Sequence, residues 1–388
     1  MLSFRRSLFL TYYLAPVFVL AAYFPPRGEW AHRRPAEAGM DAAKLQQAID
    51  FSIANENPRT KDLAVELKET FGAREPLWKL LGPTQPRGGM TGLVIRHGYV
   101  VAQWGDPERV DMTHSVAKTF LTTLTGLAWQ RGLIRNLDDH PKDIPSLADL
   151  FAGEHNRTIT WDHLLRQTSD WSGTLWGMPD WADRPVGATP ADHPNRAMHR
   201  PGTFYKYNDV RINLLALATL HVWKRPLPDV LRDKVMNPIG AADTWRWHGY
   251  ENSWVEIDGK RMQSVSGGGH YGGGMFINAW DLARFGYLFL EHGRWAGREI
   301  VSEKWIALAR SPGRANPRYG FANWFLNPDK KAYASTPASS VTFQGNGSNI
   351  VYIDWDNDLV VVVRWIESRS IDEFLGKVLG AITDPVRN

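Results

Sequence analysis

The stretch Thr113-His114-Ser115-Val116-Ala117-Lys118-Thr119-Phe120 decides the fold, because it places a serine and a lysine three residues apart. Apolar residues recur at helical spacing as far as residue 128, which predicts an amphipathic helix. A helix that begins near Ser115 brings Lys118 onto the same face, about one turn along. Backbone amides and the positive end of the helix dipole then surround the serine oxygen.

This pair suits a serine nucleophile, since a neutral amine can accept the hydroxyl proton. A lysine does so only where burial or neighbouring cations lower its pKa. The chain contains one Ser-x-x-Lys, formed by Ser115 and Lys118. The competing interpretation is an N-cap serine followed by a solvated lysine in the first turn.

Composition excludes several classes of protein. The 388 residues fit one large domain or two, and 43% hydrophobic with 22% charged residues predicts a globular chain with a sizeable core. A net charge of +4 without a Lys/Arg block argues against nucleic acid. No cysteine and no His-Glu-x-x-His are present, so we expect neither a metal nor a cofactor. The 18 tryptophans suit an apolar or flat small-molecule substrate as well as a core.

The N-terminus predicts export. Arg5 and Arg6 precede an apolar run over residues 8–24, as in a secretory signal, with an uncleaved membrane anchor as the alternative. We expect residues 1–24 to form this segment, 25–40 a Pro/Arg-rich linker and 41–388 a single domain. The domain would then be periplasmic, or membrane-anchored outside the cytoplasm.

Strand patterns at both ends of the chain flank a helical middle. Strands are predicted over 91–96, 99–104, 349–354 and 359–365, and helices over 41–55, 115–128, 160–167, 212–220, 227–235, 278–290 and 371–382. Residues 57–88 are expected on the surface, and the irregular segment 171–201 is long enough to be functional. Dense glycines in 264–275 allow close backbone approach. The simplest assembly is a sheet made from both ends, with a mostly helical insertion over about 125–262.

The order of these motifs resembles the serine hydrolases related to class C β-lactamases and penicillin-binding proteins, which include esterases and short-amide hydrolases. The matching stretches cover most of residues 90–365, namely 91–104, 115–118, 132–139, 159–169, 201–207, 272–285 and 345–347. The resemblance implies an α+β fold of the β-lactamase/transpeptidase type, an antiparallel sheet flanked by helices.

The resemblance also implies that Ser115 is the acylated nucleophile and Lys118 its proton partner. The family's Tyr-x-Asn motif has two candidates, Tyr207-Asn208-Asp209 and the literal match Tyr250-Glu251-Asn252. We choose the first because a Pro-Gly turn precedes it and a helix follows. Its phenol would pass the proton to the leaving group. Asp209 would take the place of the family's substrate-binding asparagine.

The family's third motif, Lys or His followed by Thr or Ser and Gly, is missing. Gly345-Asn346-Gly347 stands in its place, and backbone amides there with that of Ser115 would form an oxyanion hole. Loss of the cation favours an esterase or amide hydrolase over a β-lactamase or D,D-peptidase. His270, Trp171 and Trp176 are further candidates for the substrate cleft, with burial in the core as the alternative.

The sequence therefore predicts an exported serine hydrolase that acts on a small ester or amide. A β-lactamase or D,D-peptidase is the alternative within the same class. A catalytically silent, penicillin-binding-like module that only captures a ligand is the alternative from another class.

Overall fold

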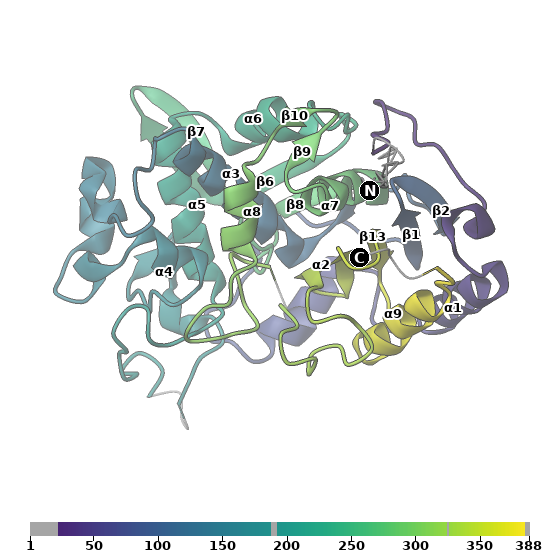
Figure 1. Ribbon diagram of the computed structural model, residues 1–388. Coiled ribbons are helices and arrows are strands. Elements are labelled where there is room, and N and C mark those ends of the chain that lie inside the picture. Colours follow the sequence, from purple (N-terminus) through teal and green to yellow (C-terminus); the bar gives the residue numbers. More distant parts are fainter. Residues whose placement is uncertain (1–21, 188–191, 324–325, 385–388) are drawn as a thin grey trace, which may run out of the picture.

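The computed structural model describes residues 22–187, 192–323 and 326–384 (Figure 1). A five-stranded antiparallel sheet has the order β11-β12-β13-β1-β2, so strands from both ends of the chain meet in it. The strands are β1 (Thr91–Arg96), β2 (Tyr99–Trp104), β11 (Val341–Gly345), β12 (Asn349–Asp354) and β13 (Leu359–Arg364). This confirms the predicted fold class, and β11 is the strand that the sequence pattern did not predict.

Three helices cover the two faces of this sheet, with α1 and α9 side by side on one face (Figure 1). They are α1 (Ala42–Ala54), α7 (Ala279–Leu290) and α9 (Ile371–Gly380). Side chains alternate along a strand, so Val361 and Val363 of β13 pack with α1 and α9, while Val360 and Val362 pack in the core that contains α7. Both faces are buried, which explains why β13 is apolar without interruption.

A second, four-stranded sheet has the order β3-β8-β6-β7. Its strands are β3 (Asp111–Met112), β6 (Arg246–Ile257), β7 (Lys260–Val265) and β8 (Gly274–Ile277). Within the insertion predicted to be mostly helical, β6 and the start of β7 are strands that the sequence pattern did not predict. The pairing of β6 with β7 shifts register between Gly249 and Trp254, and this irregularity removes the period-two pattern that marks a strand.

The remaining elements lie mostly in the insertion and around it. They are α2 (Leu63–Leu67), α3 (Ala117–Gln130), α4 (Trp161–Leu165), α5 (Asp209–Trp223), α6 (Leu227–Leu231), α8 (Glu303–Ala309), β4 (Thr174–Leu175), β5 (Met178–Pro179), β9 (Arg294–Trp295) and β10 (Arg298–Glu299). Leu63 and Leu67 of α2 are buried, so residues 57–88 are not all surface as expected.

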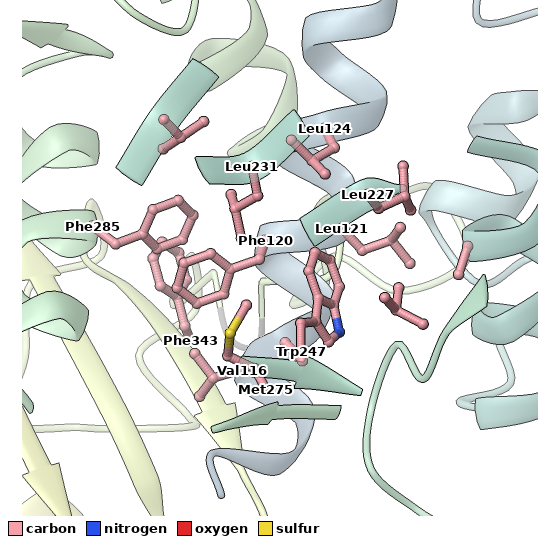
Figure 2. Close-up of a cluster of buried hydrophobic side chains, with 14 of the residues drawn as sticks. Val116, Phe120, Leu121, Leu124, Leu227, Leu231, Trp247, Met275, Phe285 and Phe343 are labelled. Carbon is pink, nitrogen blue, oxygen red and sulfur yellow. The ribbon is translucent and has the colours of Figure 1, made fainter. Parts of the chain in front are cut away.

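The buried residues on the α7 side of the large sheet form the larger of the two main hydrophobic cores, and helix α3 runs through its centre. Figure 2 shows Phe120, Leu121 and Leu124 of this helix pointing into the cluster around it. Phe120 stacks on Phe285 of α7 with ring centroids 3.9 Å apart, and Phe285 in turn meets Phe343 of β11. Every residue of α3 from position 117 to 128 is buried. This packing holds the start of α3 in one place relative to the large sheet.

The expected linker over residues 25–40 is packed against the domain instead. Trp30 is buried and its indole N–H donates to the carbonyl of Gly98 at 2.7 Å, while the amide of Arg33 donates to Val100 of β2. Most of the expected signal or anchor, residues 1–21, lies outside the described residues. None of the helices in the described ranges combines the length and the apolar character needed to cross a membrane.

We predict that Gly286→Ala destabilises the protein, because the new Cβ would lie 2.7 Å from Val351 and 3.0 Å from Val360 at the contact of α7 with the sheet. Overpacking of this kind costs about 1–3 kcal/mol, which exceeds the gain of up to about 1 kcal/mol from replacing a helical glycine. Urea unfolding measures the difference. Gly380→Ala, at the end of α9 with nothing within 4 Å of its new Cβ, is the matched control and should be neutral or stabilising. Equal effects of the two changes would contradict the packing argument.

Candidate active site

Ser115 lies in a short 3-10 helix (His114–Val116) between β3 and α3. It is partly exposed, whereas its neighbours on both sides are buried. The chain turns sharply here because His114 has a left-handed φ of 49°, a conformation that costs a non-glycine residue about 1 kcal/mol or more. The amide of Thr113 donates to Met275 of β8 at 2.8 Å, which fixes the entry to this turn.

The ring of His114 is buried, and its Nε2 has no hydrogen-bond partner. Burial, followed by the charges of Arg364 and Lys118, lowers the pKa of His114 to about 3. This histidine is therefore neutral near pH 7, and its main contribution is to the turn that presents the serine.

Lys118 and Ser115 face each other as the sequence predicts. The ammonium Nζ of Lys118 lies 2.9 Å from Ser115 Oγ and 2.6 Å from Asp209 Oδ1. Lys118 and Asp209 are both fully buried. Gly268 leaves room for this pair, since a Cβ there would lie 2.0 Å from Lys118 Nζ and 1.9 Å from Asp209 Oδ1. The glycine-rich segment thus permits close approach to an ion pair.

The charge state of Lys118 differs from the sequence-based expectation. Burial by itself would lower its pKa, but the Asp209 carboxylate and the Tyr207 phenol outweigh burial and raise it. Burial would likewise raise the pKa of Asp209, yet Lys118, Arg184 and His270 lower it. The two groups therefore form a buried ammonium–carboxylate pair, and Lys118 is not the neutral amine that a lysine base requires.

Asp209 is held from its other side by Arg184. The guanidinium of Arg184 lies 3.0 Å from Asp209 Oδ2 and also contacts the carboxylate of Asp183, which accepts from the backbone amide of Asp209. Because both carboxylate oxygens of Asp209 have charged partners, this side chain does not supply the amide contact that the family's asparagine makes. Our assignment of Asp209 to substrate binding is therefore corrected to the anchoring of Lys118.

His270 belongs to the same network and is buried, so it does not line an open cleft as expected. Its Nε2 lies 2.6 Å from Glu75, and its Nδ1 lies 3.3 Å from Arg184. Glu75, Asp183 and His270 place their donor atoms within 4.8 Å of one another, a spacing that could hold a metal ion. Arg184 already contacts all three residues, Asp183 and His270 through its guanidinium and Glu75 through its backbone amide. An added cation would lie beside its positive charge. That no metal binds remains a prediction.

Two cations lie close to the ring of Tyr207. The Nζ of Lys118 is 4.7 Å from its ring centroid and the guanidinium carbon of Arg184 is 4.8 Å from it. The alternative Tyr250 lies elsewhere: its hydroxyl accepts from Asn213 and Ser266 in the core. The structure thus brings the Tyr207–Asp209 motif, and not the literal match, to the serine.

Gly345 at the end of β11 lies against the serine loop. A Cβ at this position would lie 2.1 Å from the carbonyl of Thr113 and 3.2 Å from the amide nitrogen of Ser115. Gly347 has a positive φ of 70° and lies against the ring of Trp365, so it shapes the turn after the strand. Only the backbone near position 345 is thus next to the serine amide.

The side chain of Asn346 turns to a different partner. Its Nδ2 lies 2.9 Å from the buried carboxylate of Glu66, which Arg59 also binds. Asn346 therefore anchors the turn after β11 to α2. The cavity of about 390 Å³ beside this turn is lined by Gly345, Asn346 and Tyr333 among others, so it adjoins the serine loop through Gly345.

The two tryptophans expected as a cleft wall differ in burial. Trp171 is fully buried, and its indole N–H donates to the carbonyl of Leu150 at 2.6 Å. Trp176 is partly exposed and packs edge-on against Tyr250, 5.9 Å between ring centroids. Burial in the core, the alternative interpretation, therefore describes Trp171, whereas a place for Trp176 in a cleft wall stays a prediction.

Buried ion pairs fasten the irregular segment that carries Arg184. Asp170 and Asp180 each contact the guanidinium of Arg211, from α5, and that of Arg196. Helix α5 also begins with Asp209, which binds Lys118. The same helix therefore holds both the irregular segment and the lysine next to Ser115. Asp170 therefore anchors this segment to α5.

Sequence reasoning missed Glu75, Asp183 and Arg184 as members of the site. Residues 183 and 184 lie in the long irregular segment that we expected to be functional, but nothing in their spacing singles them out. Glu75 lies in the segment that we expected on the surface. Only the fold brings these three residues to His270.

Comparison with known proteins places the chain in a family. A family model described as Beta-lactamase matches residues 82–365, so the chain belongs to that family. No curated protein matches it in sequence. The match to the family model confirms the resemblance deduced from the motifs. The chain is a hydrolase of the β-lactamase fold.

Solved structures have the same fold at low sequence identity. A family VIII carboxylesterase superposes with a TM-score of 0.56 at 15% identity, over 88% of this chain and 99% of that one. An octameric penicillin-binding protein homologue from Pyrococcus abyssi has a TM-score of 0.56 at 17% identity, over 88% and 78%. A provisionally named 6-aminohexanoate-dimer hydrolase from Bacillus anthracis has a TM-score of 0.52 at 14% identity, over 93% and 98%. At these identities the similarities show the fold alone.

We predict that Asp209→Asn lowers the pKa of Lys118, because burial then acts without the opposing carboxylate. Nuclear magnetic resonance of 13Cε-labelled lysine follows the titration directly. Asp229→Asn, which removes a surface carboxylate paired with Arg232, is the matched control and should leave that titration unchanged. An unchanged midpoint for Lys118 in Asp209→Asn would contradict the ion-pair assignment.

The same variant tests stability. Because the folded-state pKa of Asp209 is lowered, its stabilising effect is present above the unfolded value of about 3.9 and is lost as pH falls through the folded value. Breaking a buried pair costs at most about 3–5 kcal/mol, and asparagine keeps one acceptor. The difference in free energy of unfolding between wild type and Asp209→Asn should therefore shrink below about pH 4.

Proposed function

We propose that this chain is a serine hydrolase that cleaves a small ester or short amide through an acyl-enzyme on Ser115. The observation that carries this proposal is the partly exposed Ser115 Oγ, 2.9 Å from the buried ammonium of Lys118, which is fixed by Asp209. Membership of the Beta-lactamase family supports the same reaction class.

In the proposed first step Ser115 Oγ attacks the substrate carbonyl carbon. Lys118 stays charged and donates a hydrogen bond to the serine oxygen, so it stabilises negative charge there. Tyr207 relays the hydroxyl proton: its phenol oxygen accepts this proton while the phenol's own proton passes to the leaving oxygen or nitrogen, as the carbonyl–leaving-group bond breaks. Water then attacks the acyl carbon and releases the acid, and Ser115 regains its proton.

The oxyanion of the tetrahedral intermediate needs hydrogen-bond donors at a fixed position. The amide of Ser115 is one proposed donor. The backbone at the end of β11 is the second, supported by the close approach of Gly345 to that amide.

Two features favour an ester or short amide over a β-lactam or peptide substrate. Position 209 offers no amide, and its carboxylate is occupied by Lys118 and Arg184. The strand beside the serine ends in Gln344-Gly345 and is followed by Asn346, without the cation that would bind a substrate carboxylate. β-Lactamase or D,D-peptidase activity is the second candidate.

Export is part of the proposal and rests on the N-terminal sequence. Arg5, Arg6 and the apolar run over residues 8–24 support a signal or an anchor. The catalytic domain would then act outside the cytoplasm.

We predict that Ser115→Ala abolishes labelling by a fluorophosphonate probe and lowers kcat on a nitrophenyl ester by about 10⁴-fold or more. In the proposed mechanism both the probe and the acyl group bond to Ser115 Oγ, and alanine lacks this oxygen. Ser172→Ala, at an exposed serine in the described part of the chain, is the matched control and should label like wild type.

The same assay separates the rival functions. A burst followed by steady turnover of the nitrophenyl ester supports the hydrolase. Absence of both burst and turnover in wild type would favour the silent ligand-capture module. Faster turnover of a chromogenic cephalosporin than of any ester or short amide would favour a β-lactamase.

Tyr207→Phe tests the proton transfer. The ring and its contacts with Lys118 and Arg184 are kept while the hydroxyl is lost, so kcat should fall by about 10²–10⁴-fold with little change in KM. Tyr99→Phe, on β2 at the opposite edge of the sheet from β11, is the control. A kcat of Tyr207→Phe within a factor of about two of wild type would exclude the phenol as proton carrier.

A further inference from the structure

A second cavity, of about 250 Å³, lies at the N-terminal end of α7. Its walls come from the segment before β1, from the loop after β2, from the segment before β6 and from the first turns of α7. Trp30, Glu108, Ala242 and Asp281 represent these four parts, and none of the residues discussed at the serine lines the cavity. The cavity is therefore separate from the proposed active site.

Two buried polar atoms of residues that line this cavity have no hydrogen-bond partner. The carboxylate of Asp281 is only 2% exposed, and its Oδ1 accepts from the amide of Ala242 at 3.0 Å while Oδ2 has no partner. The indole N–H of the adjacent Trp280 is also unpaired. Buried groups of this kind are normally satisfied, because leaving one unpaired costs about 1–3 kcal/mol. An acceptor and a donor thus remain unsatisfied on two consecutive residues of α7.

The cation in the cavity does not satisfy Asp281. The guanidinium of Arg284 donates to backbone carbonyls, at 2.6 Å to Pro26, 2.8 Å to Glu29 and 2.9 Å to Ile239. Its hydrogen-bonding capacity is directed to the backbone, so Arg284 holds the N-terminal segment in place. No hydrogen bond or ion pair joins it to Asp281 among the described residues.

The charge and the walls of the cavity favour a cation with an apolar body. Carboxylates of Asp281, Glu29 and Glu108 line it, against the single permanent cation Arg284. The rings of Trp30 and Trp280 lie 6.3 Å apart at 41° and form an aromatic wall, in which the guanidinium of Arg284 already lies over the Trp30 ring, 5.2 Å from its centroid. Indole faces attract positive charge, and this attraction increases when the cation is desolvated.

We propose that this cavity binds a small organic ammonium ion that carries a hydroxyl or carbonyl oxygen. The ammonium donates to Asp281 Oδ2, the oxygen accepts from Trp280 Nε1, and the apolar body lies against the two indoles. The ligand satisfies both unpaired atoms, and its charge balances the excess of carboxylates. This inference is independent of the proposed hydrolase activity.

The probe for the test is 2-amino-1-phenylethanol, and 1-phenylethanol is its neutral counterpart. Isothermal titration calorimetry of the full chain should detect saturable binding of the amine and at least roughly tenfold weaker binding of the alcohol, since the alcohol lacks the charge. Asp281→Asn keeps the acceptor for Ala242 and removes the charge, so it should weaken amine binding by roughly tenfold or more. Ser115→Ala should bind the amine like wild type.

A pH series on wild type gives a second measurement that needs no variant. Burial raises the pKa of Asp281 to about 6, against the Ala242 amide and Arg284, which lower it. The carboxylate is charged above this value and neutral below it, so amine affinity should fall as pH drops through about 6. The other charged or titratable groups near it are Glu108, Glu29, Arg27 and His32.

Three results would each overturn the proposal. They are no saturable binding of the amine, equal affinity for the amine and the neutral alcohol, and equal affinity of wild type and a folded Asp281→Asn. Should Asp281→Asn fail to fold, the pH series decides, and an affinity that does not change between pH 5 and pH 7.5 would reject the site.

Discussion

The buried pair between the Lys118 ammonium and the Asp209 carboxylate is the interaction on which the site depends. Neither charge is tolerable alone in the interior, so each fixes the other. Gly268 leaves space for the pair and Arg184 holds the second carboxylate oxygen. Helices α3 and α5, which supply the two charges, are thereby joined at their N-terminal ends.

Two buried carboxylates show how surroundings decide the chemistry of one residue type. Asp209 has Lys118 and Arg184 within hydrogen-bond distance, and its pKa falls despite burial. Asp281 accepts one hydrogen bond from a backbone amide, and burial raises its pKa to about 6. Both carboxylate oxygens of Asp209 have partners, whereas Oδ2 of Asp281 has none. This difference is why we assign positioning to one and ligand binding to the other.

Local sequence pattern was sufficient to predict regular elements and pairs of functional residues that lie within one helical turn of each other. The short apolar runs of β1 and β13 predicted strands of the sheet, and the spacing of Ser115 and Lys118 predicted that these two side chains face each other. Pattern failed for β6, where a register shift breaks the alternation, and for β11, a short edge strand. It also placed Trp171 at a cleft, because sequence cannot distinguish a core indole from an exposed one.

The sequence by itself determined the family, the position of the serine and lysine, and the meeting of the two chain ends in one sheet. The tertiary structure alone decided the charge state of Lys118, because that depends on Asp209, 91 positions away along the chain. It likewise decided that Glu75, Asp183 and Arg184 join the network and that Trp280 and Asp281 line a cavity. The physical reason is the same in each case. Burial and charge pairing arise between segments distant in sequence, and no local pattern records them.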